Sequence, residues 1–185
     1  MLLFVSPLCP LSSALFSVRV VHHALLATVV APLLARALPR LRIGGGLPGW
    51  TAAHVLTLWL WHAPPVYNQA LASDAICWAR QLSILATASG CWAALRRAEV
   101  PGAVLMLLLA TMTMGLLGAL ITFASVPLYG PHLLTTAAWG LSALEDQQLG
   151  GLIMWAPASL AYLLAALFQL GRMLGGGESL ASQPD

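Results

Sequence analysis

The sequence predicts an all-α fold, a polytopic bundle of transmembrane helices with about five full spans plus a short N-terminal remnant. Three observations predict it. Charged residues make up only 8% of the 185 positions and hydrophobic residues 59%, whereas a soluble domain carries about 25% charged residues. Apolar runs of about 20 residues, long enough to cross a bilayer, recur along the chain. Arginines gather in alternate connections between those runs.

The apolar runs define the expected spans, which cover about residues 14–35, 49–71, 76–95, 100–125 and 147–171. The second run is continuous to Trp61 and is followed by Pro64 and Pro65, so the span either ends near Trp61 or continues through a Pro-Pro kink to Leu71. The residues before Ser12 are too short to cross a membrane alone, and they are read as the remnant of another span. Residues 1–172 therefore form one helical bundle. The Gly-rich stretch that follows predicts a short flexible cytoplasmic tail over 173–185.

The arginines predict the orientation of the chain. All eight basic residues are arginine, and six lie in alternate connections: Arg36, Arg40, Arg42, Arg96, Arg97 and Arg172. The positive-inside rule places these connections and the C-terminus in the cytoplasm, and it places the 126–146 loop outside. The formal net charge of +2 is too small to indicate a nucleic-acid partner. The partner that the composition predicts is the lipid bilayer.

Polar side chains converge in the outward half of the predicted bundle. Such groups are costly inside a membrane and tend to mark function. We expect a polar network there, in which Asp146 pairs with Arg19, Arg80 or Gln81. The complete set of polar candidates is Arg19, His22, His23, His62, Tyr67, Arg80, Gln81, Asp146 and Gln147.

Two of these positions and one methionine fall at a common depth. With a rise of about 1.5 Å per residue, His22, His62 and Met154 each lie roughly 12 Å from the outer end of their helices. Imidazole and thioether are ligands that suit copper, and thioether favours Cu(I). The predicted metal ligands are therefore His22 or His23, His62 and Met154, and His62 should face one member of the histidine pair. The structural alternative is that each histidine only hydrogen-bonds a neighbouring helix. Met112 and Met114 are assigned to packing.

No enzymatic motif stands out in the chain. It contains no GxSxG, HExxH, P-loop or GxGxxG in a suitable context. The expectation from the sequence is that the protein is not an enzyme.

Three ordered segments resemble the CtaG family of cytochrome c oxidase assembly factors. They are the stretch from Val21-His22-His23 to Ala31-Pro32, the stretch Leu60-Trp61-His62-Ala63-Pro64-Pro65-Val66-Tyr67, and the stretch from Asp146-Gln147-Gln148 to Met154-Trp155-Ala156-Pro157. The last matches the family's DQQxxGxxMWxP pattern. Family members carry more helices before the His-His segment, so this chain looks N-terminally short. They also carry a Leu-Glu-His sequence where this chain has Ala79-Arg80-Gln81, so that imidazole is missing here.

The resemblance implies a bacterial inner-membrane protein that helps assemble a haem–copper cytochrome c oxidase. Its implied role is to deliver copper to the oxidase catalytic subunit or to mature that subunit. The implied functional residues are His22 or His23, His62 and the segment from Asp146 to Met154. Two other functions stay open: a b-type haem redox protein with these histidines as axial ligands, and a metal-free scaffold.

Overall fold

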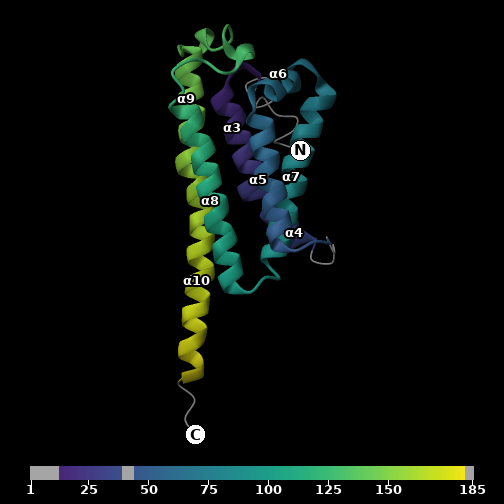
Figure 1. Cartoon of the computed structure of the whole chain (residues 1–185), viewed down its shortest axis with the longest axis vertical. Coiled ribbons are helices and arrows are strands. Elements are labelled where there is room, and N and C mark those ends of the chain that lie inside the picture. Colours follow the sequence, from purple (N-terminus) through teal and green to yellow (C-terminus); the bar gives the residue numbers. More distant parts are fainter. Residues whose placement is uncertain (1–12, 39–43, 182–185) are drawn as a thin grey trace.

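A computed structural model describes residues 13–38 and 44–181 of the chain, and Figure 1 shows its helices lying side by side along the long axis. Within these residues the chain forms helices and no strands. The predicted N-terminal remnant, Arg40, Arg42 and the last four residues of the predicted tail lie outside the described residues. The elements are α3 (Phe16–Leu25), η1 (Leu26–Val30), α4 (Ala31–Ala37), α5 (Leu47–His62), α6 (Pro64–Ala72), α7 (Asp74–Leu95), α8 (Val100–Thr122), η2 (Gly130–His132), η3 (Ala137–Trp139), α9 (Ala143–Ile153), η4 (Met154–Ala158) and α10 (Ser159–Ala181).

Three helices are long and apolar enough to cross a membrane: Phe16–Ala37, Val100–Thr122 and Ala143–Leu174. The predicted count of five spans is therefore not confirmed. The second predicted span is divided into α5, which has 16 residues, and α6, which has nine. The third corresponds to α7, which has 22 residues but contains Asp74, Arg80 and Gln81.

The burial pattern differs from that in a soluble protein. Arg19, Arg80 and Asp146 are each no more than 3% exposed, whereas large apolar side chains such as Met112 and Phe168 are at least 65% exposed. Charged residues are rarely fully buried in soluble proteins. Buried charges inside an otherwise apolar core, under an apolar exterior, are the arrangement expected of a helical bundle whose outer surface faces lipid.

The two ends of the bundle differ in charge. We call the end that carries Arg36, Arg96, Arg97 and Arg172 the arginine end, which is the lower end of the bundle in Figure 1. The opposite end, formed by α6 and the connection between α8 and α9, is called the loop end. The last helix, α10, continues to Ala181 and extends past the other helices at the arginine end, so it runs beyond residue 172, where the predicted bundle ends.

Prolines set the irregular points of the helices. Pro64 disfavours helical geometry at the residue before it, and Ala63 is extended (φ −65°, ψ 125°), so α5 ends at His62, the first of the two ends that the sequence left open, and α6 follows as a separate helix. Pro32 follows the π-helical turn η1, and Pro157 lies inside the π-helical turn η4. A proline removes one backbone N–H from the helix ladder, and π-helical turns are frequent at functional sites.

The start of the last long helix is fixed by local hydrogen bonds. The Ser142 hydroxyl accepts from the Glu145 amide at 3.2 Å, and the Glu145 carboxylate accepts from the Ser142 amide at 2.8 Å. This capping box begins α9 at Ala143, four residues before the predicted start of the fifth span. Gln147 then holds the preceding loop, because its Oε1 accepts from the Leu128 amide at 2.6 Å.

Candidate functional site

His62 and His23 face one another inside the bundle. Both are 3% exposed, and their ring centroids lie 5.7 Å apart with the planes nearly perpendicular. Two imidazoles that share one metal at roughly 2 Å have centroids up to about 6 Å apart. The separation observed therefore lies within the range that a shared metal ion permits.

A backbone hydrogen bond fixes the tautomer of His62. Its Nδ1 lies 2.7 Å from the Leu58 carbonyl oxygen. A carbonyl can only accept, so Nδ1 carries the proton and the neutral ring keeps a lone pair on Nε2. Metal-binding histidines are commonly oriented in this way, with one nitrogen donating to a carbonyl while the other is left for the metal. The Nε2 atom of His62 and both ring nitrogens of His23 have no hydrogen-bond partner among the described residues.

Two methionines complete the surroundings of this histidine pair. A cavity of about 10 Å³ is lined by both histidines together with Met114 and Met154, and the residues around them are apolar except for Thr28 and Tyr162. We call this space the His–Met cavity. Met154 is the predicted thioether, and it begins the π-helical turn η4. The sequence assigned Met114 to packing, but Met114 lines the same cavity. The rotation of α8 turns Met114 inward and leaves Met112 73% exposed.

The sequence left open whether His22 or His23 faces His62. Successive residues of a helix point about 100° apart, so only one of the two can face α5. His23 makes that contact, whereas His22 is buried beside it with its centroid 6.0 Å from that of His23. Within the described residues, no group of three His, Cys, Asp or Glu side chains is placed to hold a metal ion. A site at the His–Met cavity would combine two imidazoles with thioether sulfur.

Asp146 anchors the beginning of α3. Its carboxylate is fully buried and accepts from the Phe16 amide at 2.6 Å, the Ser17 amide at 3.1 Å and the Ser17 hydroxyl at 2.5 Å. The sequence predicts that Asp146 lies within salt-bridge or hydrogen-bond reach of Arg19, Arg80 or Gln81, and that pairing stays a prediction. The contacts with Phe16 and Ser17 make Asp146 a cap for the free N–H groups of another helix, where the helix dipole also stabilises negative charge.

The two buried arginines lie close to Tyr67. The guanidinium carbon of Arg19 is 5.8 Å from the centre of the Tyr67 ring, and that of Arg80 is 5.9 Å from it. At these distances a cation is attracted by the electron-rich face of an aromatic ring. Arg80 also donates to the Cys77 sulfur at 3.3 Å, and Gln81 donates to the same sulfur at 3.5 Å. These residues form a polar layer between the His–Met cavity and the loop end.

Two further buried histidines did not emerge from the sequence. His132 lies in η2, where its Nε2 is 2.7 Å from the Tyr67 hydroxyl and its Nδ1 is 3.1 Å from the Ala14 carbonyl. Its position depends on the path of the 123–142 connection, which no sequence pattern specifies. His54 lies deeper in the bundle, with Nε2 2.9 Å from the Tyr162 hydroxyl. His54 lies on the same face of α5 as the buried residues Thr51 and Leu58. The spacing of these three residues, three and four apart, is the sequence signal that could have placed His54 on the inward face.

Comparison with known proteins identifies the family. No curated protein and no solved structure matches the chain. The model of one family, described as the cytochrome c oxidase caa3 assembly factor (Caa3_CtaG), matches residues 1–175. That match spans nearly the whole chain and agrees with the three segments that carry the resemblance. The chain belongs to the caa3-type cytochrome c oxidase assembly factor family.

Proposed function

We propose that this chain is a membrane-embedded, non-catalytic assembly factor that holds Cu(I) at the His–Met cavity for the catalytic subunit of a haem–copper oxidase. Family membership supports the role in oxidase assembly. The observation that carries the copper assignment is the pair His23 and His62, which border a cavity shared with Met114 and Met154 and have three ring nitrogens without a hydrogen-bond partner among the residues that the structure describes. Unpaired polar atoms in a buried position are rare and need an explanation, and a bound ion is one that fits two imidazoles facing a shared cavity.

The donor set selects the kind of metal. Neutral imidazole and thioether are borderline and soft ligands, which favour Cu(I), and the described lining of the cavity contains no carboxylate. Arg19 lies one helical turn before His23 on α3, and Arg80 belongs to the polar layer beside the cavity. Two nearby guanidinium groups repel a divalent ion twice as strongly as a monovalent one. The site therefore favours Cu(I) over Cu(II) or Zn(II).

The size of the cavity favours copper over haem. Its volume of about 10 Å³ is close to the space that one water molecule needs. Sites for ligands of cofactor size are clefts of roughly 300–1,000 Å³. A single ion fits between these rings, whereas a porphyrin between His23 and His62 would require the helices to separate.

The proposed setting is the bacterial inner membrane. The arginine end faces the cytoplasm by the positive-inside rule, so the loop end and the polar layer face outward. The His–Met cavity then lies beneath the outer face, where the copper centres of an oxidase subunit within the same bilayer could be reached through protein contact.

Copper binding by the purified chain tests this proposal. We expect about one Cu(I) per chain under reducing conditions, and Ag(I), another soft monovalent ion, should compete for the site while Zn(II) does not. His62→Ala and Met154→Leu should each weaken binding by at least tenfold. Met112→Leu is the matched control, because Met112 lies on α8 near Met114 but faces outward. A Soret band in place of copper would support haem, and neither signal would support a metal-free scaffold.

A further inference from the structure

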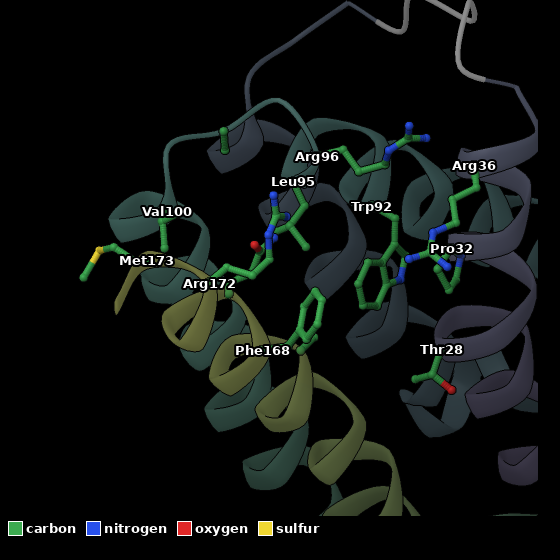
Figure 2. A pocket seen from close by; sticks show the side chains of 13 residues that line it. Thr28, Pro32, Arg36, Trp92, Leu95, Arg96, Val100, Phe168, Arg172 and Met173 are labelled. Carbon is green, nitrogen blue, oxygen red and sulfur yellow. The ribbon is translucent and has the colours of Figure 1, made fainter. Parts of the chain in front are cut away.

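A second and much larger hollow lies at the arginine end. It has a volume of about 610 Å³ and is lined by residues of η1, α4, α7, α8 and α10. α4 packs against α7, and α10 packs against α8. The hollow occupies the space between these two helix pairs, as the view from close by shows (Figure 2). We call it the arginine pocket.

Three arginines from three different elements line this pocket: Arg36 of α4, Arg96 at the end of α7, and Arg172 of α10. Figure 2 shows all three around the hollow. The described residues that line it include no Asp or Glu. Helix dipoles stabilise positive charge at the C-terminal ends of α4 and α7. Arg172 lies inside α10, away from a helix end, so no helix dipole stabilises its charge. An anion in the pocket would reduce the repulsion among the three positive charges.

Arg96 is held in place by the backbone. Its Nη1 donates to the Ala35 carbonyl at 2.5 Å, which ties the end of α7 to α4. Within the described residues, Arg36 and Arg172 make no hydrogen bond or ion pair. Guanidinium groups bind phosphate through paired N–H donors, and an anchored guanidinium loses less side-chain entropy on doing so.

Away from the arginines, toward the middle of the bundle, the lining of the pocket is mostly apolar, with Thr28 and Gln169 as its polar members. Trp92 and Phe168 line its walls, and Thr28 lies two helical turns from Arg36, or roughly 12 Å along the helix axis. The Trp92 ring is held rigidly, because its Nε1 donates to the Ala27 carbonyl at 2.8 Å. Pro32 lacks the N–H that would pair with this carbonyl in the π-helical register. Phe168 is 65% exposed and joins the pocket to the apolar outer face of α10.

A pocket with a positive rim and apolar walls fits an anionic lipid better than it fits a metal cation or a free phosphate. The three positive charges oppose entry of a metal cation, so the pocket is not a route to the His–Met cavity. A free phosphate would use the rim and leave the apolar walls uncovered. Basic pockets between transmembrane helices bind the head groups of anionic lipids.

We propose that the arginine pocket binds an anionic glycerophospholipid, whose phosphate contacts Arg36, Arg96 and Arg172 while its acyl chains lie along Trp92, Phe168 and the outer face of α10. The lipid bridges the two helix pairs and thereby stabilises the bundle at this end. This assignment is independent of copper binding.

Thermal unfolding of the delipidated full chain in detergent, with lipid added back, tests the proposal. Phosphatidylglycerol or cardiolipin should raise Tm by about 5–10 °C at about 100 times Kd. Phosphatidylcholine and inorganic phosphate should give much smaller shifts. Native mass spectrometry of the untreated protein should show one retained anionic lipid per chain.

Charge variants separate the pocket from general surface attraction. The double variant Arg36→Gln/Arg172→Gln should lose most of the lipid-dependent shift, and Arg36→Lys should keep part of it because the charge remains. Arg97→Gln is the matched control, since it removes the same charge next to Arg96 outside the pocket lining. An equal loss in Arg97→Gln, an equal shift with phosphatidylcholine, or an equal shift with inorganic phosphate would overturn the proposal. So would the absence of any lipid shift, which would leave an acidic segment of a partner protein as the occupant.

Discussion

At the scale of single residues, hydrogen bonds to backbone carbonyls decide what each buried histidine can do. In His62 and His132 the Nδ1 atom lies against a carbonyl, so Nε2 of the neutral ring holds a lone pair. In His132 that lone pair is used, because it accepts from the Tyr67 hydroxyl. In His62 it has no partner among the described residues and borders the His–Met cavity. The same residue type is therefore structural in one place and suited to a ligand in the other.

The neutral state of His132 predicts a pH dependence of stability. Burial lowers the pKa of His132 below its ordinary value, and Arg19 adds to this, while the Ala14 carbonyl and Asp146 oppose it. The unfolded chain, with a His pKa of about 6.5, then binds more protons than the folded chain as the pH falls below that value. Stability should therefore decrease from about pH 6.5 downward.

The variant His132→Gln tests this expectation, because glutamine can also donate and accept but does not titrate in this range. Unfolding followed at pH 7.5 and pH 5.5 should show a larger loss of Tm in the native chain than in the variant, by about 2–4 °C for each kcal/mol of linkage. Equal losses in the two proteins would show that other groups, such as the remaining buried histidines, account for the acid sensitivity.

At the scale of the elements, the close contact between α8 and η4 depends on a glycine, which has no side chain. A Cβ placed on Gly118 of α8 would lie 2.7 Å from the Trp155 amide nitrogen and 2.8 Å from the Gly151 carbonyl oxygen. Both are backbone atoms and cannot move aside without moving the helix. Small residues at such crossings let the backbones of membrane helices approach. This crossing sets the position of η4, and through it the position of Met154 in the His–Met cavity.

We therefore expect Gly118→Ala to destabilise the protein by about 1–3 kcal/mol, the usual cost of overpacking. Gly102→Ala is the control on the same helix, because a Cβ there would meet nothing within 4 Å. Thermal unfolding should show a lower Tm for Gly118→Ala and an unchanged or higher Tm for Gly102→Ala. The first variant should also bind copper more weakly if the crossing holds Met154 in place. A Gly118→Ala protein as stable as the control would contradict this account of the packing.

At the scale of the whole molecule, the sequence predicted helices well and their details less well. Apolar runs identify the long helices because lipid-facing length is a strong constraint. The start of α9 was missed because it depends on the Ser142 capping box. The sequence left open whether the second span ends before Pro64 or continues through a kink, and the extended backbone at Ala63 ends it there. The sequence predicted a common depth for His62 and the histidine pair, but it could not select His23, because that requires the rotation of α3 about its axis. The position of Met114 in the lining of the cavity and that of His132 beside Tyr67 depend on tertiary contacts alone.

The orientation of the bundle is the last prediction, and it follows from charge alone. Arg36, Arg96, Arg97 and Arg172 lie at one end of the bundle, whereas the connection between α8 and α9 carries no basic residue other than His132. Arginine-rich connections stay on the cytoplasmic side. Reporter fusions after Asp185 and within the loop near Pro131 should therefore give opposite signals, cytoplasmic for the first and periplasmic for the second. A periplasmic signal at the C-terminus would show that the bundle has the opposite orientation in the membrane. The His–Met cavity would then open toward the cytoplasm and the arginine pocket would lie in the outer leaflet. The copper delivery proposed above would then need another route, whereas the lipid binding proposed for the arginine pocket would be unaffected.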